Sequence, residues 1–569
     1  MSSKPRSRAR TGSPGARPRP SAAGGPARDL LAPPGGAPWT WSALLAAAMF
    51  ACYVALAPHV SGDKDASEFT LVLATGGVLH PTGYPVYTML GHAFVVIAHA
   101  LGAGFPFAAN LWVAFGAGVA LFMLHRLALR LLPATAALSR VERFLLAALP
   151  VMVLGFNPVW MVECTMVEVH SWQMAWACGT AIVWVGLLDA LERDGARVAR
   201  FGWRMAGWGF LCGLGGAHHS TAVFLAGGMT LALVVALVRA HRLRAWVPLL
   251  WLGAGVVPLL CYLYVGYRAF HPGDAFLWPP LEPNTGSVLG HVAASAYGRY
   301  LGRWAPGVTQ LEWLHTYVYP FLWPGLVLLA VQCRLALGAR RLALGGLLVA
   351  AVAQLAFVYR YGVPDPDAYF LPPLVAVLLA VVHPAAGLLT RLRPTRHGVA
   401  LAGSAVLVLL GFWGVLHVQM LALRTRALTQ ADTYFHARWS EIPNGRAVVL
   451  WPRDEFLMLK EYQRFRGEKS RLDVQCTGML FYARPRRLFQ EKYGLDPLAL
   501  LDREHLSAPL RREYVIGQQD SPTQALAYAL VHQCIAERSI VPVVAFDPPN
   551  PTRILPGRAA PESLLRAPL

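Results

Sequence analysis

Long apolar stretches recur along most of the chain, separated by short polar or basic loops. A helix needs about 20 mainly apolar residues to cross a hydrocarbon core of about 30 Å. Eleven stretches of 15 to 25 residues meet or approach that length, so we predict an α-helical polytopic membrane protein with 11 to 13 transmembrane helices. The stretches are residues 39–57, 107–131, 143–160, 167–190, 205–219, 221–238, 246–267, 313–332, 342–358, 369–388 and 399–422.

One further apolar segment, residues 84–102, is left out of this count. It lies along the outer surface, enters the bilayer as a re-entrant segment, or crosses together with a second uncounted segment. Each of these arrangements keeps the end of the chain on the same side of the membrane.

Arginine clusters alternate along the loops and predict the orientation. Every second loop is basic, and the positive-inside rule assigns those loops, with the arginine-rich N-terminus, to the cytoplasm. We therefore expect a multi-pass protein of the inner (plasma) membrane with an extracytoplasmic C-terminal part. The basic loops contain Arg126, Arg130, Arg140 and Arg143, then Arg193, Arg197, Arg200 and Arg204, then Arg239, Arg242 and Arg244, then Arg334, Arg340 and Arg341, and finally Arg391, Arg393 and Arg396.

Composition changes divide the chain into three parts. Residues 1–38 are rich in Pro, Gly, Ser and Arg and are expected to be a disordered basic tail. Residues 39–422 form the transmembrane domain, whose first span is expected to be a retained signal anchor, although Ala55 and Ala57 resemble a cleavage site. Residues 423–569 alternate short β runs with amphipathic helices, which predicts a soluble α/β domain.

The overall composition excludes an ordinary soluble protein. Of 569 residues, 55% are hydrophobic and only 14% are charged, whereas soluble domains have about 25% charged residues. The net charge of +19 does not indicate nucleic-acid binding, because the arginines lie in short clusters between apolar runs. The eight cysteines have no metal-ligand spacing, and Cys476 and Cys534 are the two that could pair.

The first outward loop carries the most concentrated chemistry. Its sequence, SGDKDASEFTLVLATGGVLHPTGYP, places Asp63, Asp65, Glu68 and His80 directly after the first apolar stretch. Acidic groups so close to a bilayer are costly to keep without a use, which favours an active-site loop at the membrane surface over a solvated helix end. A metal site built from the same four side chains is a less favoured alternative, because they lack a tight ligand motif.

The other outward loops also collect polar residues. A histidine at a helix end is more often structural than functional, so their recurrence on one face of the bundle is the stronger signal and predicts the wall of a cavity. Besides Asp65, Glu68 and His80, the candidate substrate-binding residues are Tyr84, Glu168, His170, His218, His219, Arg268, Arg299, Arg360, Asp367 and Tyr369. Glu163, Asp274, Glu282, His291, Arg303 and Asp365 lie nearby in the same loops.

Sugar transfer from a polyprenyl-phosphate carrier needs such an arrangement. The lipid tail stays in the bilayer while the sugar reaches water, a base removes the proton of the acceptor hydroxyl, and a cation stabilises the departing phosphate. We expect Arg268, Arg299, Arg303 or Arg360 to supply the cation. The acceptor is expected to be a protein or glycan, with no cofactor beyond the lipid-linked donor and no resident metal.

Several motifs in the chain resemble one known family. Asp65-Ala-Ser-Glu68-Phe, followed by His80-Pro-Thr-Gly-Tyr-Pro, resembles the D-x-G-E-[FL] and H-P-P-G-Y-P-L-Y block of a membrane family with eukaryotic protein O-mannosyltransferase members, whose bacterial members mostly carry a domain-of-unknown-function label. NPVWMVECTMVEVHSW, GLGGAHHST and PDPDAYFLPP are similar to later blocks of that family, in order. LWPRDEFLMLKEYQRFRGEKSRLDV is similar to a segment of its soluble part.

The resemblance implies a GT-C fold glycosyltransferase with Asp65 as catalytic aspartate and Glu68 beside it. Mannose is one option for the sugar. The chain departs from the family pattern at Thr82, where the family has Pro, at His170, where it has Tyr, and at Ala217, where it has Asn. A transporter or flippase of a lipid-linked substrate is the alternative function, and a non-catalytic envelope scaffold is a third.

Overall fold

The structure is a computed structural model of the chain. It describes residues 38–62, 65–132, 138–194, 200–302, 304–363, 365–392, 396–442, 444–451, 456–503, 522–538, 543–547 and 550–555. The basic tail, Asp63 and Arg303 therefore lie outside the described residues, as does the short β run predicted at 512–517.

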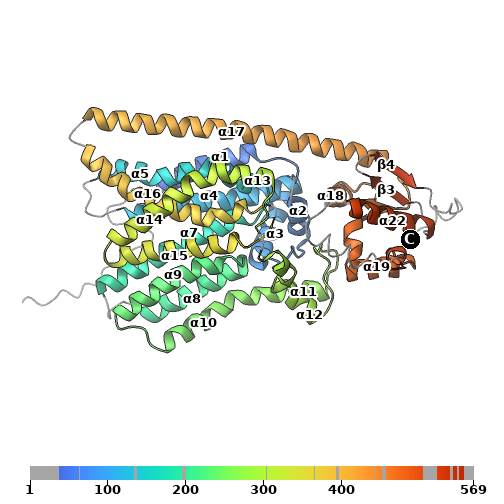
Figure 1. Cartoon of the computed structure of the whole chain (residues 1–569), viewed down its shortest axis with the longest axis horizontal. Coiled ribbons are helices and arrows are strands. Elements are labelled where there is room, and N and C mark those ends of the chain that lie inside the picture. The colour runs from blue at the N-terminus through green and yellow to red at the C-terminus, as the bar shows by residue number, and fades with distance from the viewer. Residues whose placement is uncertain are drawn as a thin grey trace, which may run out of the picture.

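Long helices packed side by side make up the larger part of the molecule (Figure 1). They are α1 (Trp39–Leu56), α4 (Phe105–Leu131), α5 (Arg140–Gly155) with the short α6 (Pro158–Thr165) that follows it, α7 (His170–Asp194), α8 (Phe201–His218), α9 (Ala222–Arg239), α10 (Trp246–Leu259), α14 (Tyr319–Leu335), α15 (Gly338–Val358), α16 (Leu371–Leu392) and α17 (Arg396–Glu441). Shorter helices at one end of the bundle are α2 (Ala66–Thr75), α3 (Pro85–Ala100), α11 (Leu263–Phe270), α12 (Thr285–Val292) and α13 (Val308–Trp313).

Nine helical segments in the described part of the chain are long and apolar enough to cross a membrane, and ten if a bent pair counts as one span. The sequence predicted eleven. The stretch predicted at 143–160 is bent by 73° between α5 and α6, because Pro158 has no N–H to continue the first helix and Asn157 caps the second. The stretch predicted at 205–219 forms α8, which includes Arg204 and six glycines and is not among the nine.

The segment 84–102 contains α3, which is not among the candidate spans. Its 16 residues extend about 24 Å, less than the hydrocarbon thickness of about 30 Å. Tyr87 and Val95 are buried in the main core of the bundle, whereas Leu90 and Ile97 are exposed. Helix α3 packs against α2, α4 and α8, so the prediction that this segment does not cross alone agrees with the structure.

The C-terminal part contains a four-stranded sheet with the order β2-β1-β3-β4. Strands β1 (Ala447–Trp451), β2 (Leu472–Cys476) and β3 (Val543–Asp547) run parallel, and β4 (Asn550–Leu555) is antiparallel to β3. The helices here are α18 (Phe456–Arg466), α19 (Ala483–Tyr493), α20 (Ala499–Arg503) and α22 (Pro522–Arg538). The predicted mixture of strands and helices is therefore present.

Helices cover both faces of strand β1, which is buried along its whole length. Val449 and Trp451 face the core that contains α18 and Trp439, while Val448 and Leu450 face the core that contains α22. The α18 core also includes Leu71 of α2, so the sheet unit packs directly on a helix of the bundle. Figure 1 shows this contact at the end of the bundle where α2 and α3 lie.

Helix α17 connects the two parts without a break. Its 46 residues run along the bundle and continue to the sheet (Figure 1), so the boundary predicted between residues 422 and 423 lies inside one helix. The predicted three-part division otherwise remains a prediction. The suggested Cys476–Cys534 disulfide is wrong for this structure, in which both cysteines are buried and no disulfide joins them.

Candidate active site

Helix α2 begins at the candidate catalytic aspartate. Asp65 is the N-cap residue, a position where an aspartate side chain usually accepts a backbone N–H of the first turn. Here the Asp65 side chain makes no capping hydrogen bond, and 56% of it is exposed. Its carboxylate is therefore exposed and does not form a capping hydrogen bond with the helix.

The loop after α2 returns to it through two glycines. Gly76 ends the helix with a left-handed conformation, φ 62°, which glycine adopts without a steric penalty. A Cβ on Gly77 would lie 1.7 Å from the carbonyl oxygen of Phe276, so only glycine allows this approach. Val78 then exchanges backbone hydrogen bonds with Phe276 and Trp278, which fixes the path of the chain to His80.

Glu68 and His80 form the centre of the site. Glu68 Oε1 accepts hydrogen bonds from the backbone N–H of His80 at 2.7 Å and from its Nδ1 at 3.0 Å. His80 Nε2 lies 3.2 Å from the hydroxyl oxygen of Tyr84, and that hydroxyl donates to the carbonyl of Pro81 at 3.3 Å. The imidazole is thus held at both nitrogens, and its Nδ1 lies 3.9 Å from Asp65 Oδ2.

The electrostatics of this pair favour a charged histidine. Burial alone would lower the pKa of His80, but the charge and hydrogen bonds of Glu68, with Asp65 and Asp365 nearby, raise it to about 9. Burial raises the pKa of Glu68 to about 7 against the opposing effect of His80. Between these two values the pair is an ion pair, and a positive charge lies next to the exposed Asp65.

A second carboxylate–histidine cluster lies where α6 ends and α7 begins. Glu163, Glu168 and His170 each offer one atom, and these atoms lie within 4.8 Å of one another, as do those of Asp65, Glu68 and His80. Carboxylate oxygens and imidazole nitrogens are ligands for Zn²⁺ or Mn²⁺, so either set could hold a divalent cation. We call them the first cluster (Asp65, Glu68, His80) and the second cluster (Glu163, Glu168, His170).

Aromatic rings connect the two clusters. Tyr84, which contacts His80, stacks on His219 with ring centroids 5.3 Å apart. His219 lies 5.5 Å from His170 of the second cluster, and the ring of Tyr369 lies 5.6 Å from His170. The Thr221 backbone N–H donates to His219 Nδ1, which leaves Nε2 as the protonated nitrogen of a neutral ring.

The structure therefore brings together most of the residues that the sequence singled out. Four separated segments contribute them, as expected for the convergent polar residues of a binding site. The associated residues are Asp65, Glu68, His80, Tyr84, Glu168, His170, His219 and Tyr369. His218 is buried and stacks on Tyr87 one helical turn after Tyr84.

The arginines predicted to stabilise the phosphate, and the predicted substrate-binding Asp367, lie elsewhere or outside the described set. Arg268 is on α11, where its guanidinium lies over the rings of Tyr264 and Tyr267. Arg360 has an exposed side chain, the side chain of Arg299 is outside the described part, and Asp367 is buried at the start of a short 3₁₀ helix, Asp367–Phe370. Among described residues, neither Arg268 nor Arg360 forms an ion pair with the first cluster, so their role remains a prediction.

Sequence reasoning missed the residues that hold the two loops in place. Asn110 on α4 donates to the carbonyls of Pro58 at 2.9 Å and Val60 at 3.1 Å, and its oxygen accepts from Val167 N–H at 2.9 Å. One fully buried amide thus links the segment before Asp65 to the segment before Glu168. An asparagine inside an apolar stretch, FAANLWVAF, was the available signal.

A second missed contact comes from the C-terminal part. Ser61 Oγ donates to Glu461 Oε1 of α18 at 2.6 Å and lies 3.0 Å from Thr70 Oγ1 of α2. Glu461 is buried, and burial raises its pKa to about 8 against the hydrogen bonds from Ser61 and Ser67. The sheet unit therefore places a carboxyl group against the loop that precedes Asp65. No motif in either segment indicates this pairing of residues 400 positions apart.

Comparison with known proteins finds one family and several solved structures. Residues 65–243 match the family described as Protein O-mannosyl-transferase TMEM260 N-terminal domain. The matched region contains both clusters and His219, and the resemblance expected from the sequence is confirmed there. No curated protein matches the chain.

Two solved structures illustrate the structural similarity. An oligosaccharyltransferase, AglB from Archaeoglobus fulgidus, in complex with an inhibitory peptide and a dolichol-phosphate, has a TM-score of 0.44 and 11% identity, covering 74% of this chain and 63% of its own. ArnT from Cupriavidus metallidurans, bound to undecaprenyl phosphate, has a TM-score of 0.48 and 14% identity, covering 74% and 85%. This chain spans less than two thirds of the archaeal protein.

The predicted polytopic helical class agrees with the helical bundle, and the predicted relation to protein O-mannosyltransferases agrees with the family match over residues 65–243.

Proposed function

We propose that the protein is a membrane glycosyltransferase that moves a sugar from a polyprenyl-phosphate carrier to a hydroxyl acceptor, with inversion at the sugar carbon. Asp65 is the general base. The acceptor oxygen attacks the anomeric carbon, its proton passes to the Asp65 carboxylate, and the bond from that carbon to the phosphate oxygen breaks. The products are the glycosylated acceptor and the polyprenyl phosphate.

The single observation that carries this proposal is the state of the Asp65 side chain. Glu68 is 1% exposed and already accepts hydrogen bonds from His80, whereas Asp65 is 56% exposed and makes no capping bond. A general base must be within hydrogen-bond reach of the proton that it removes. Of the two carboxylates in the first cluster, Asp65 is the one that an acceptor hydroxyl can reach.

His80 supplies the positive charge in this proposal. As an imidazolium it stands 3.9 Å from Asp65, and it can stabilise the negative charge that develops on the leaving phosphate. Glu68 acts on the substrate only through His80, by keeping the imidazole oriented and protonated. Arg268, Arg299 and Arg360 are proposed to contact the substrate more remotely, as are Tyr84, Glu168, His170, His218, His219, Asp367 and Tyr369.

The family match supports a hydroxyl acceptor on protein and mannose as the first sugar to test. Purified protein in lipid nanodiscs is incubated with radiolabelled polyprenyl-phosphate mannose and with other radiolabelled polyprenyl-phosphate sugars in separate reactions, with envelope protein and glycan fractions as acceptors. Transfer of label from one donor, with an inverted anomeric linkage, is the expected result. Retention of configuration would contradict the base mechanism. In sealed proteoliposomes, movement of intact donor across the bilayer without transfer would favour a flippase.

The orientation is tested separately. His59 is exposed in the segment between α1 and the first cluster, so a single cysteine at this position, in a chain with the native cysteines replaced, reports the side on which that cluster lies. We expect this cysteine to be labelled when a membrane-impermeant maleimide is added to the outside of right-side-out inner-membrane vesicles. Labelling only from the cytoplasmic side would contradict the proposal, since the sugar of the donor would then face the wrong compartment.

A further inference from the structure

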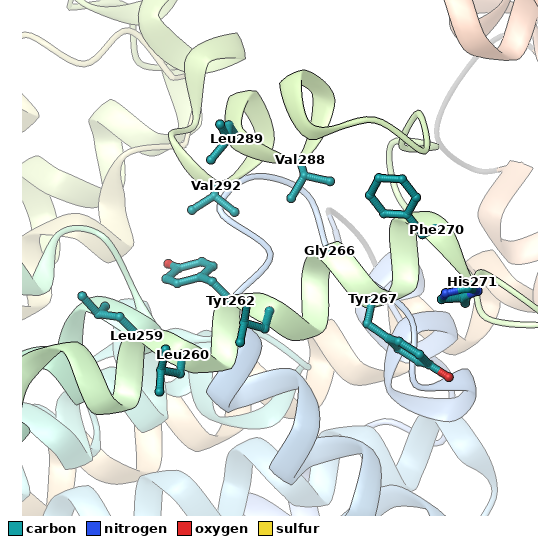
Figure 2. A pocket seen from close by; sticks show the side chains of 11 residues that line it. Leu259, Leu260, Tyr262, Gly266, Tyr267, Phe270, His271, Val288, Leu289 and Val292 are labelled. Carbon is teal, nitrogen blue, oxygen red and sulfur yellow. The ribbon is translucent and has the colours of Figure 1, made fainter.

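A groove with apolar walls lies beside the candidate active site, between α11 and α12 (Figure 2). Its volume is about 490 Å³. The side chains come from the end of α10, the 3₁₀ turn Leu260–Tyr262 that follows it, the outer face of α11 and one face of α12, and most are aliphatic or aromatic. The lining residues include Tyr262, Leu263, Tyr267, Phe270, Val288 and Leu289.

Helix α11 has two different apolar faces. Val265 and Ala269 are fully buried in a small core with Val78 and Leu277, whereas Leu263 is 70% exposed and Tyr267 is 59% exposed. The exposed face continues the candidate span Trp246–Phe270, of which only 11% is buried within the protein. A helix face with such exposed apolar side chains is expected to contact lipid or an apolar ligand instead of water.

Both walls of the groove are attached to the loop that carries His80. A Cβ on Gly83 would lie 3.2 Å from Val265 of α11, and His291 Nε2 of α12 lies 2.9 Å from the carbonyl oxygen of Leu79. Tyr264 on α11 donates its hydroxyl hydrogen bond to the carbonyl of Gly76. Helices α11 and α12 therefore line the groove and also contact the segment from Gly76 to Gly83.

One end of the groove is polar. His271 lines it, and Arg268 lies on α11 between Tyr264 and Tyr267, with a guanidinium nitrogen 3.1 Å from the position of a Cβ on Gly76. The remaining lining is apolar, apart from the hydroxyls of Tyr262 and Tyr267. A ligand that fits has a long apolar chain and an anionic group at one end.

We propose that this groove binds the first isoprene units of the lipid-phosphate donor and directs its phosphate toward the loop of the first cluster. The proposal deepens the function proposed above and rests on it. Arg268 accounts for the anionic end, and the attachment of both walls to residues 76–83 accounts for the position beside His80. A phospholipid from the surrounding bilayer is the alternative occupant of this apolar surface. Competition between the two kinds of lipid distinguishes them.

The first test fills the groove. Gly266 on α11 has only Val288, at 3.9 Å, near the position of a Cβ, so Gly266→Phe places a ring between α11 and α12 with little displacement. We expect the KM for a long-chain donor to rise about tenfold with little change in kcat, because the variant removes a contact made equally before and during reaction. A short donor whose phosphate carries a methyl group in place of the isoprenoid chain should lose less than about twofold, because it has no isoprene units to place in the groove.

Gly253→Phe on α10 is the matched control. No atom lies within 4 Å of a Cβ at Gly253, and this glycine belongs to the same candidate span without lining the groove. The control should leave the KM of both donors unchanged. Equal changes for Gly266→Phe and Gly253→Phe, or equal losses with long and short donors, would overturn the proposal.

The second test does not depend on catalysis. A diazirine-bearing polyprenyl phosphate without a sugar is photolysed with the wild-type protein in nanodiscs, and labelled peptides are mapped by mass spectrometry. We expect label on α11 and α12, reduced by unlabelled polyprenyl phosphate and not by phosphatidylethanolamine. Equal competition by both lipids overturns the groove assignment. Labelling without transfer from any sugar donor would reject the proposed function while supporting the groove.

Discussion

The two carboxylate–histidine clusters have the same composition of two carboxylates and one imidazole, but they differ in their access to solvent. In the first cluster, Asp65 is 56% exposed, while in the second Glu163, Glu168 and His170 are all less than a tenth exposed. The first cluster also has an internal ion pair between Glu68 and His80. Only the first combines a fixed positive charge with a carboxylate that an incoming hydroxyl can reach.

This difference shows that residue type and spacing do not identify the reacting group. Both clusters are close enough for metal binding or proton transfer, and both lie within the matched family region. The local backbone decides between them: an N-cap residue without a capping bond faces outward, whereas a segment inserted between helices is enclosed. We therefore propose that the first cluster carries out proton transfer and that the second cluster holds the rings of His219 and Tyr369 in place.

The largest predicted effect separates the two clusters directly. Asp65→Asn keeps the shape of the side chain but removes the base, so transfer should fall roughly 10²–10⁴-fold while expression and membrane insertion stay intact. Glu163→Gln should reduce the initial rate by less than about tenfold, within the range of a modest packing change. The rates are measured with the radiolabelled donor.

Asp274→Asn, at an exposed aspartate that contacts Arg464 only through its backbone carbonyl, serves as the matched control. It should retain wild-type transfer. Full activity of Asp65→Asn would remove the proposed base, and a loss in Glu163→Gln as large as that in Asp65→Asn would reverse the comparison of the clusters.

A pH profile sharpens the assignment of the charged histidine. With a pKa of about 9 for His80, transfer should fall as the pH rises through that value, because the positive charge is lost. The protonated histidine also contributes stability that is full below its ordinary pKa of 6.5 and disappears as the pH rises through about 9. Below a pH of about 7, protonation of Glu68 weakens the ion pair and should lower the rate again.

Glu68→Gln removes the main group that raises the pKa of His80 and leaves the opposing effect of burial. The alkaline loss of activity should therefore move to lower pH, with a fall of about tenfold at pH 8. A variant with reduced activity but an unchanged pH profile would mean that Glu68 is only structural.

The amide of Asn110 couples the clusters and gives a smaller effect. Asn110→Leu leaves two carbonyl oxygens and one N–H buried without this partner, which should destabilise the protein by about 2–3 kcal/mol in a detergent unfolding assay. Because both loops lose their common support, kcat should fall about tenfold. Gln332→Met, which removes a buried amide bonded to the carbonyl of Ala380, should lower stability without lowering kcat. Equal kcat losses in both variants would contradict the coupling.

Chelation should have the smallest effect. The Nδ1 of His80 is already engaged by Glu68, and the proposed base reaction needs no Lewis acid. Dialysis against EDTA should change transfer by less than about twofold. Loss of activity that Mn²⁺ or Zn²⁺ restores would assign a resident cation to one of the clusters and would remove the distinction between them.

The sequence predicted the parts of this protein that depend on local composition. Runs of apolar residues located the long helices, and the Asp65, Glu68 and His80 pattern located the first cluster through its family resemblance. The bend at Pro158 was missed because hydropathy continues smoothly across it. Hydropathy averages over a window and does not register one missing backbone donor.

The sequence could not predict which side chains face each other. Tyr84, His219 and Tyr369 meet through the rotation and packing of separate helices, and the pairing of Ser61 with Glu461 depends on how the sheet docks. Arg268 looked equivalent to the other outward arginines, yet it lies on tyrosine rings beside the groove. These properties depend on three-dimensional packing that no single segment encodes.

Helix α17 determines the orientation of the sheet relative to the bundle about the helix axis. Thr425 bonds to the carbonyl of Leu56 at the end of α1, and Asp432, two turns later, accepts from Tyr462 of α18. One residue inserted between them would turn the sheet by about 100° and raise it by about 1.5 Å, and seven would nearly restore the angle at a displacement of about 10.5 Å. Either change would carry Glu461 away from Ser61, although both halves could still fold. The length of one helix thus determines whether the C-terminal part meets the loop before Asp65.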